Sequence, residues 1–421
     1  MHKRRLDLLT ERGHTIPSLP QKLRVAFVSP YPPTKCGLAA FTQDLVSATK
    51  TAMPESEIGI VAIDKGEGVH PTQPEVVFRV DQDRPDTYLA AARFLNHHAD
   101  VVSVQHDFGV FGIHGPYLPY LQQDYLAPFL QELKVPVVVT LHAVPPHAHP
   151  TEQASLLNAV KKSAATVVMS KTAASMLIQD YCAPAEKVVY LPFGVPDINP
   201  LDRQQLRSQR AVSDRIVVTT FGLISGWKGL EYAIRAITRV ALTHTDVVYL
   251  IIGQTHPEVL RREGESYRRS LQALIEDLDA SKHVQFVNRY LSRDEIAEYL
   301  VATDVYVTPY PNYGQTGSYT LNHALAAGKA IVSTPYIYAA EVLADGRGVL
   351  ADFRSAESLA NAICSILDKP DEKRRLERNA YAYGRSMAWT HVGQDFAALL
   401  RDSWEGKPLI NPHLWQSLPA S

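Results

Sequence analysis

The fold is decided by the stretch DVYVTPYPNYGQTGSYTLNHALAAGKAIVSTP, residues 304–335. It begins with an apolar run at 304–308, which is typical of a buried strand, and continues into a loop that contains proline and glycine. Residues 317–327 have the pattern of a helix, with serine and threonine in the first turn and a glycine just past the end. A second apolar strand at 330–334 closes the unit. The stretch therefore predicts one βαβ unit.

The loop of this unit is a candidate ligand site. Open α/β sheets bind ligands at the carboxyl ends of their strands, which is where this loop lies. Backbone N–H groups at the start of the helix, near Gly317, Ser318 and Tyr319, suit a phosphate. An ordinary crossover helix without a ligand explains the same stretch equally well.

The same alternation of strands and helices extends over the chain. Apolar runs without an in/out alternation are typical of parallel strands covered on both faces, and their alternation with helices is typical of a doubly wound sheet. The first half contains predicted strands at 23–29, 58–63, 76–80, 101–105, 135–141, 166–170 and 187–191, with helices at 39–50 and 85–97. The second half contains predicted strands at 216–221, 247–252, 283–287, 305–308, 330–334 and 347–350, followed by a mostly helical segment at 355–400.

A proline-rich break separates the two halves. Residues 192–200, PFGVPDINP, and the polar residues after them indicate a linker. We therefore expect an α/β protein with two doubly wound, Rossmann-like domains that face each other across a cleft. The predicted boundaries are an N-terminal domain at 1–196 that starts with a surface arm, a C-terminal domain at 197–400, and a tail at 401–421 that packs back on the N-terminal domain.

Composition argues against several classes of protein. A chain of 421 residues is too long for one ordinary core, and a formal net charge of −2 does not favour nucleic-acid binding. The three cysteines, Cys36, Cys182 and Cys364, fit a reducing compartment rather than a disulfide scaffold. No apolar run approaches the roughly 20 residues that span a bilayer, and no apolar stretch follows the basic start as in a secretory signal. We expect a cytoplasmic protein.

Polar residues at the predicted strand ends of the first half are candidates for a binding site. Gly37, in the loop before the first helix, would allow a ligand to approach the backbone, although the loop is not a GxGxxG motif and a plain turn explains it as well. His106 and Asp107 follow one strand and His142 follows the next. His142 could bond a sugar hydroxyl or a phosphate, or transfer a proton, although a lone histidine is more often structural.

The second half adds a candidate cation, and neither half adds a metal site. Lys228 lies where a strand ends and a helix begins, so its ammonium could neutralise a diphosphate, although a solvated lysine is the simpler interpretation. Asp81 and Asp83 form an Asp-x-Asp pair of the kind that can hold a divalent cation, but in this polar loop we interpret them as solvated. His147 and His149 lack a third ligand. We predict no metal.

Taken together, these landmarks resemble the retaining glycosyltransferases of family 4, which have the GT-B fold. The resemblance covers about residues 22–400, and it rests on the order of Gly37, His106, His142, the Pro-Phe-Gly-Val run at 192–195, Lys228 with Gly229, and the 309–335 unit. It implies that Gly37 approaches the donor diphosphate, that His142 lies near the transferred sugar, and that Lys228 binds the donor phosphates. It also implies that the amides of residues 317–319 hold the diphosphate and sugar, and that His106 and Asp107 lie on the acceptor side.

Two departures from the family pattern stand out. Leu223 occupies a position that is usually arginine in the family, and Arg289 is a candidate replacement for it. The Glu-x7-Glu motif of the family appears here as Gln315 and His323. The first position normally bonds hydroxyls of the donor sugar, and Gln315 keeps hydrogen-bonding capacity without a charge. The second normally bonds the ribose, which His323 could also do.

The resemblance implies transfer of a hexose from a nucleotide-diphosphate sugar to an acceptor hydroxyl, with retention at the anomeric carbon. His142, Gln315 and Lys228 are the expected catalytic residues, and the leaving diphosphate would be stabilised electrostatically, without a cofactor or a metal. The expected partners are a nucleotide sugar and a saccharide or other small hydroxylated acceptor, without nucleic acid or an integral membrane segment. The balanced charge of residues 1–196 favours a soluble acceptor.

Two other functions fit the same sequence. One is a sugar-nucleotide epimerase of the same fold, for which His106, Asp107 and His142 could supply acid–base groups. The other is a nucleotide-sugar-binding protein without catalytic activity, in which the activity was lost together with the two glutamates.

Overall fold

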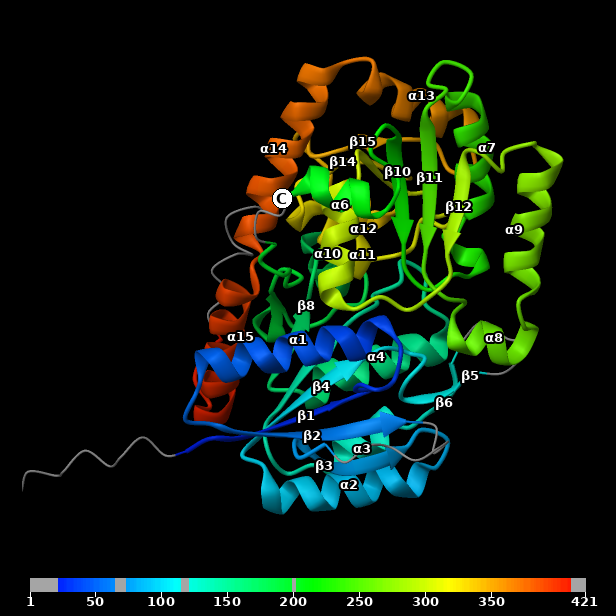
Figure 1. Cartoon of the computed structure of the whole chain (residues 1–421). Coiled ribbons are helices and arrows are strands. Elements are labelled where there is room, and N and C mark those ends of the chain that lie inside the picture. Colours follow the sequence, from blue (N-terminus) through cyan, green and yellow to red (C-terminus); the bar gives the residue numbers. More distant parts are fainter. Residues whose placement is uncertain (1–21, 65–72, 115–120, 199–201, 410–421) are drawn as a thin grey trace, which may run out of the picture.

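Two α/β domains make up the computed structural model, one above the other in Figure 1. The structure describes residues 22–64, 73–114, 121–198 and 202–409. Each domain contains a parallel sheet between layers of helices, which confirms the α/β fold expected from the alternation of strands and helices. The predicted N-terminal arm lies outside the described residues, apart from Lys22.

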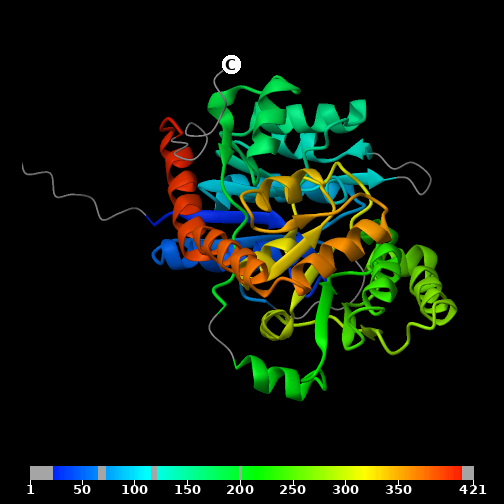
Figure 2. The same cartoon turned by 90° about the horizontal axis from the view of Figure 1, so that it is seen from above.

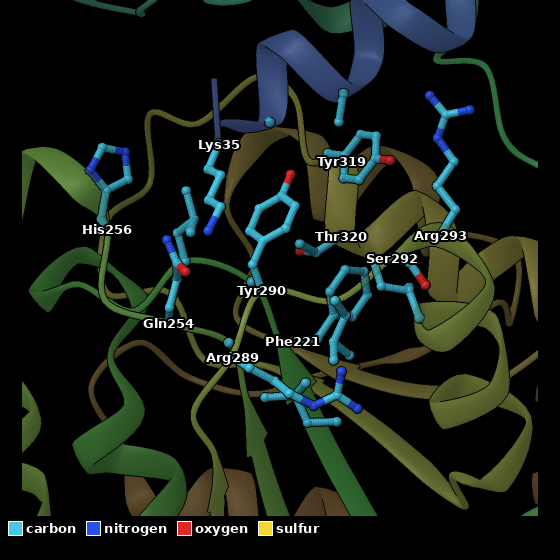
Figure 3. Close-up of a pocket in the computed structure, with 18 of the residues that line it drawn as sticks. Lys35, Phe221, Gln254, His256, Arg289, Tyr290, Ser292, Arg293, Tyr319 and Thr320 are labelled. Carbon is cyan, nitrogen blue, oxygen red and sulfur yellow. The ribbon is translucent and has the colours of Figure 1, made fainter. Parts of the chain in front are cut away.

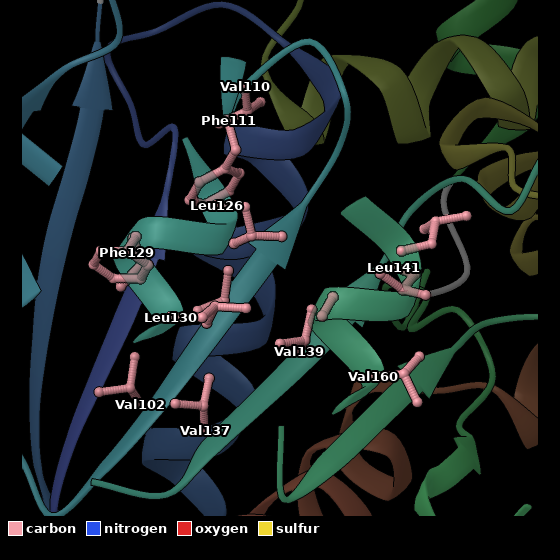
Figure 4. Packing of buried hydrophobic residues seen from close by; sticks show 14 of the residues in the cluster. Val102, Val110, Phe111, Leu126, Phe129, Leu130, Val137, Val139, Leu141 and Val160 are labelled. Carbon is pink, nitrogen blue, oxygen red and sulfur yellow. The ribbon is translucent and has the colours of Figure 1, made fainter. Parts of the chain in front are cut away.

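The N-terminal sheet has the strand order β3-β2-β1-β4-β7-β8-β9, and all of its pairs are parallel. Its strands are β1 (Arg24–Ser29), β2 (Glu57–Asp64), β3 (Val76–Asp81), β4 (Val101–His106), β7 (Val137–Leu141), β8 (Ala165–Val168) and β9 (Val188–Tyr190). Its helices are α1 (Gly37–Ala52), α2 (Pro85–His98), α3 (Leu126–Glu132), α4 (Pro150–Lys162), α5 (Lys171–Gln179) and the short η1 (Ala185–Lys187). Apolar side chains fill the space between sheet and helices, as Figure 4 shows for Phe129 and Leu130 of α3 above Val102 and Val137.

One element of this domain was not expected from the sequence. The strands β5 (Gly112–His114) and β6 (Leu121–Asp124) form an antiparallel pair beside the main sheet. Strands of three and four residues are too short for a hydrophobic period to be recognised, so sequence reasoning missed them.

The C-terminal sheet has the order β12-β11-β10-β13-β14-β15 and is also fully parallel. Its strands are β10 (Ile216–Phe221), β11 (Val247–Ile252), β12 (Val284–Val287), β13 (Val305–Thr308), β14 (Ala330–Ser333) and β15 (Val349–Leu350). Its helices are α6 (Arg203–Gln209), η2 (Gly226–Lys228), α7 (Leu230–Val240), α8 (Pro257–Glu263), α9 (Ser266–Asp277), α10 (Arg293–Ala302), α11 (Tyr319–Ala326), α12 (Ile337–Val342), α13 (Ala356–Leu367) and α14 (Pro370–Ser386). The stretch 304–335 forms β13, α11 and β14, as predicted, and every residue of these two strands is buried.

The chain crosses between the domains twice, and the two crossings are hydrogen-bonded to each other. The Val195 N–H donates to the carbonyl of Met387 at 2.9 Å, and the Trp389 N–H donates to the carbonyl of Val195 at 3.0 Å. Gly194 leaves room for the Trp389 ring, because a Cβ atom at this position would lie 2.2 Å from a ring carbon. The linker expected at 192–200 is therefore tied to the second crossing.

The last described helix, α15 (Trp389–Glu405), lies on the N-terminal domain. It packs along α1, where Gly393 contacts Ala48, and the rings of Phe396 and Phe27 are 6.1 Å apart. Figures 1 and 2 show α14 and α15 following one another down the side of both domains. The chain thus returns to the N-terminal domain at residue 389 rather than at 401, because the apolar face of α15 completes the N-terminal core. None of the helices in the described ranges has the length and apolar character needed to span a membrane.

Polar contacts also join the domains beside the cleft between them. Arg293, at the start of α10, forms a 2.7 Å ion pair with Asp44 of α1 and donates to the Gln43 side chain at 2.8 Å. On another edge, the Glu341 carboxylate of α12 accepts from the first two N–H groups of α5, at 2.9 and 2.8 Å. A carboxylate at a helix N-terminus is favoured by the helix dipole, so this contact stabilises the arrangement of the two domains.

The Asp44 carboxyl is buried at this contact, and burial changes its acidity. Burial raises the pKa of Asp44 to about 6, although the Arg293 guanidinium beside it acts in the opposite direction. Because the folded-state pKa lies above 3.8, the usual value for an aspartate, the folded protein binds this proton more tightly than the unfolded chain does. The contribution of Asp44 to the free energy of unfolding therefore falls as the pH rises from about 4 to about 6.

Replacing Gly194 by alanine tests the packing of the two crossings. Gly194→Ala should lower the free energy of unfolding by roughly 1–3 kcal/mol, because the new methyl group overlaps the Trp389 ring, which is itself packed against Phe41. The measurement is chemical denaturation. Gly226→Ala is the matched control, because a Cβ atom at Gly226 has no neighbour within 4 Å. Equal stability of Gly194→Ala and the wild type would contradict this packing.

Replacing Arg293 by glutamine tests the ion pair between the domains. Arg293→Gln removes the cation that favours ionised Asp44, so the pKa of Asp44 should rise above its value of about 6. The measurement is an NMR titration of the aspartate carboxyl carbons. Arg289→Gln serves as the control, because Arg289 pairs with Glu295 instead. A downward shift, or an equal shift in both variants, would refute the assignment.

Candidate functional site

A cavity of about 830 Å³ lies between the two domains (Figure 3). The loop between β1 and α1, which contains Lys35, lines its N-terminal side, as does Gly37, which is the first residue of α1 rather than a loop residue as expected. The loops after β10, β11 and β12, together with the loop and helix start at Gln315–Thr320, line its C-terminal side. Parallel strands end at one edge of their sheet, so these loops meet at the cavity. Its volume is within the range of about 300–1,000 Å³ that is common for small-ligand sites.

The N-terminal end of α11 faces the cavity, as the sequence predicted for a ligand loop. Gly317, Ser318, Tyr319 and Thr320 all line it. Ser318 caps the helix, since its Oγ accepts from the N–H of Leu321 at 3.3 Å. The remaining N–H groups of the first turn and the helix dipole favour an anion at this point.

Lys228 also lines the cavity, from the η2 turn before α7. Its Nζ donates to the hydroxyl of Tyr310 at 2.8 Å. Gly229 makes this approach possible: it has a φ of 63°, and a Cβ atom there would lie 2.2 Å from the carbonyl oxygen of Pro309. Burial acts to raise the pKa of Tyr310, but the Lys228 ammonium and the hydrogen bonds to its hydroxyl together outweigh burial, so that the pKa is lowered from its usual value.

Three further cations line the cavity, and they differ in their partners. Arg289, the candidate replacement for a missing arginine, is ion-paired with Glu295, and Arg293 is ion-paired with Asp44. Lys35 reaches from the N-terminal domain and places its Nζ 5.7 Å from the centroid of the Tyr290 ring (Figure 3).

Lys35 and Lys228 differ from the two arginines in charge balance. Neither lysine makes an ion pair with a residue in the described part of the chain. Sequence reasoning missed Lys35, Tyr290 and Arg293. Lys35 could have been found, because it lies two residues before Gly37 in the loop that was already a candidate site.

Gln315 and Leu223, two positions at which the sequence departs from the family pattern, both line the cavity. The Gln315 Nε2 donates to the carbonyl of Gly317 at 2.7 Å. This bond fixes the side chain within the loop and leaves the amide oxygen as a hydrogen-bond acceptor. Gln315 is thus placed where it was expected.

His323 is not where the resemblance placed it. The side chain is 3% exposed and is not among the residues that line the cavity. Its Nδ1 donates to the carbonyl of Tyr319 at 2.8 Å, and its ring packs against Tyr319 and Phe221. Burial lowers the pKa of His323 to about 4, so the ring is neutral. The residue lies beneath the cavity because α11 turns this position toward the core.

His142 lies beside the cavity, half buried, rather than in its lining. Its Nε2 is 3.0 Å from the Gln105 Oε1, and the edge of Phe41 packs against its ring. The Gln105 amide nitrogen donates to Ser103, so its oxygen is the acceptor and the His142 Nε2 carries the proton. Burial lowers the pKa of His142 to about 3, so the ring is a neutral hydrogen-bonding group.

His106 and Asp107 do not line the cavity either. The His106 ring is 1% exposed and packs against Phe108 and Phe111, and burial lowers its pKa to about 4. The Asp107 carboxylate accepts from the N–H of Gly109 at 3.0 Å. These residues shape the end of β4 and are separate from the cavity that Gly37 and Lys228 share.

The aspartates of the Asp-x-Asp pair also lie away from the cavity. Asp81 accepts from the N–H of Asp83 at 3.1 Å, at the end of the edge strand β3. Within the described ranges, no three His, Cys, Asp or Glu side chains are grouped as metal ligands.

Residues 202–383 match the family model of the glycosyl transferases group 1. A curated relative is the D-inositol 3-phosphate glycosyltransferase of Corynebacterium glutamicum, which is 22% identical over 206 residues, 48% of each chain. Another is the phosphatidyl-myo-inositol mannosyltransferase of Mycolicibacterium smegmatis, which is 26% identical over 62% of this chain and 63% of the relative. The match thus spans about half to two thirds of these relatives.

Solved structures with the same fold cover nearly the whole chain. HepE of Anabaena, solved in complex with UDP, has a TM-score of 0.70 at 18% identity, and the match covers 90% of this chain and all of that one. The sucrose-phosphate synthase of Thermosynechococcus elongatus has a TM-score of 0.71 at 16% identity over 92% of this chain and all of that one. The chain therefore has the GT-B fold, and its segment 202–383 is similar to the glycosyl transferases group 1.

Proposed function

We propose that this chain is a retaining glycosyltransferase, which moves a hexose from a nucleotide-diphosphate sugar to a hydroxyl group of a soluble acceptor. One observation carries the proposal. Lys228 and Lys35, two lysines without carboxylate partners in the described part of the chain, meet the N-terminal end of α11 at one cavity. A diphosphate carries the negative charge that such a site attracts. HepE, which has the same fold, has been solved with UDP and with UDP-glucose.

The lining residues suggest how the donor would lie. Lys228 and the N–H groups at the start of α11 would hold the diphosphate on the C-terminal side. Gly37 faces it from the N-terminal side, where a Cβ atom would meet nothing within 4 Å, so the space next to its backbone is open. The Gln315 amide oxygen would accept from a sugar hydroxyl. His142, fixed as a neutral ring by Gln105, would contribute a hydrogen bond rather than a charge.

The chemistry would rely on stabilising the leaving group. The bond from the anomeric carbon to the diphosphate oxygen breaks, a bond to the acceptor oxygen forms on the same face, and the diphosphate takes the acceptor proton. Fixed positive charge and helix N–H groups stabilise the leaving diphosphate in place of a metal ion. Among the described residues that line the cavity, Asp294 is the one carboxylate, and it belongs to the first turn of α10. Chelation with EDTA should therefore leave the rate unchanged.

The proposed acceptor is soluble. The two relatives named above act, by their names, on an inositol phosphate and on a phosphatidyl-inositol, so acceptors of both kinds occur among similar proteins. In this chain, the N-terminal half has nearly equal numbers of basic and acidic residues, which does not favour an anionic membrane surface. Tight binding to anionic vesicles at physiological salt would contradict the proposal.

We further propose a cytoplasmic location, which suits three free cysteines.

The epimerase and the non-catalytic binding protein predict different products. An epimerase needs acid–base groups at the sugar, and His106 and Asp107 are not among the cavity-lining residues. Incubation with UDP-, GDP- and ADP-sugars and a panel of saccharide acceptors separates the three functions. Released nucleotide with a glycoside of unchanged anomeric configuration supports the proposal. An epimerised nucleotide sugar, or binding without turnover, would overturn it.

Replacing Lys228 by alanine tests the placement of the diphosphate. Lys228→Ala should weaken the binding of a nucleoside diphosphate by about 1.5–3 kcal/mol, because one charge-assisted hydrogen bond is lost. Isothermal titration with UDP, GDP and ADP measures the effect. Lys282→Ala, which changes an exposed lysine of the same domain outside the cavity, is the control. Unchanged affinity in a Lys228→Ala protein that unfolds like the wild type would refute this role.

Restoring the family carboxylate tests the role of Gln315. Gln315→Glu should lower turnover, because it removes the donor to the Gly317 carbonyl and adds a negative charge beside the proposed diphosphate. Gln315→Ala should lower turnover more than it lowers nucleotide affinity. Steady-state kinetics and nucleotide titration measure the two effects. If Gln315→Glu creates activity in a protein that has none, the natural chain is a binding protein and the proposed function fails.

A further inference from the structure

Tyr310 is buried next to the cavity and connects two of the groups that line it. Its side chain is 1% exposed and stacks on Tyr336, with ring centroids 5.1 Å apart. Its hydroxyl accepts from the Lys228 Nζ at 2.8 Å and lies 3.0 Å from the Thr320 Oγ1. Lys228 comes from the η2 turn and Thr320 from the first turn of α11, so one phenol joins two separate elements.

The chemistry of the groups fixes the direction of the first of these two contacts. An ammonium group can only donate, so the Tyr310 oxygen is the acceptor from Lys228. The Tyr310 oxygen also lies 3.0 Å from the Thr320 Oγ1, and either hydroxyl can donate in this second contact. When the phenol donates, the proton of Thr320 is free to point elsewhere, because the Ser318 oxygen, at 3.5 Å, is too far away to hold it firmly. In that arrangement the remaining protons of Lys228 and the hydroxyl of Thr320 can both donate to a ligand in the cavity.

We propose that Tyr310 is a positioning residue that makes Lys228 and Thr320 act as one binding unit for the diphosphate of the donor. Tyr310 does not itself line the cavity, whereas both of its partners do. The contact between Gly229 and Pro309 presses the η2 turn against the loop that carries Tyr310, so the ammonium is held close to the phenol before any ligand arrives. A preorganised pair of donors binds an anion more strongly than two donors that must first be ordered. This inference rests on the proposed function, because it assumes a nucleoside diphosphate ligand.

The test is a Tyr310→Phe variant of the full chain, which keeps the stacked ring and removes only the hydroxyl. We expect the Kd for UDP, GDP or ADP, whichever the wild type binds best, to rise about tenfold, which is the effect of losing roughly one charge-assisted contact. The Kd of the matching nucleoside, uridine, guanosine or adenosine, should stay the same, because it has no phosphate. Tyr249→Phe is the matched control: Tyr249 is also fully buried and donates to a threonine Oγ1, that of Thr220, but it is not a cavity residue.

A double-mutant cycle separates positioning from a general structural role. If Tyr310 acts through Lys228, then Lys228→Ala should cost much less diphosphate affinity in the Tyr310→Phe background than in the wild type. Thr320→Val should show the same non-additivity with Tyr310→Phe, and Thr320→Ser, which keeps the hydroxyl, should restore the coupling. These comparisons hold even if Tyr310→Phe is somewhat less stable, because each one is made within one background.

The possible outcomes are distinct. Three outcomes would overturn the positioning role and leave the proposed function intact. The first is that the effects of Tyr310→Phe and Lys228→Ala on diphosphate affinity are additive. The others are an equal loss of nucleoside and diphosphate affinity, or a Tyr249→Phe variant that behaves like Tyr310→Phe. A wild-type protein that binds none of the three nucleoside diphosphates would overturn the proposed function and this inference with it.

Discussion

The parallel pairing of all strands in both main sheets is the constraint on which the site depends. Because parallel strands end at the same edge, each sheet delivers its loops to one side, and the two sheets direct those sides toward a common cavity. The hydrogen bonds between Val195, Met387 and Trp389 then fix where one domain lies on the other. A shift at these crossings would move Lys35 and Gly37 away from the start of α11, since the first two belong to one domain and the helix to the other.

Charge balance divides the cations of the cavity into two groups. Arg289 and Arg293 are each neutralised by a carboxylate, so they contribute shape and domain contact more than net attraction. Within the described part of the chain Lys35 and Lys228 form no ion pair, and their ammonium groups lie near the side chains of Tyr290 and Tyr310 respectively. An aromatic ring stabilises a cation without cancelling its charge, so the positive potential remains available to a ligand. The two tyrosines therefore help to hold the lysines in place while the cavity keeps its positive charge.

Local patterns in the sequence predicted the elements that depend on local interactions. The 304–335 unit, Lys228 with Gly229 and the loop at Gly37 were recognised because the periodicity, the glycines and the strand ends lie within a few residues of one another. Contacts between distant segments were not recognised. Arg293 meets Asp44 across about two hundred and fifty positions, and the orientation of His323 depends on how Phe221 and Tyr319 pack around it. No short sequence window contains that information.

The position of α15 has a consequence for the order in which the protein folds during synthesis. The N-terminal core includes Phe396, Leu399 and Leu400, which pack with Phe27 and Phe41 from the beginning of the chain. When a ribosome has made the first two hundred residues, the face of the sheet that carries Phe27 still lacks this helix. Domains usually fold as they emerge, but this one cannot complete its core until nearly the whole chain has been translated. Truncation before residue 389 would therefore leave the apolar surface around Phe27 and Phe41 of the N-terminal domain exposed.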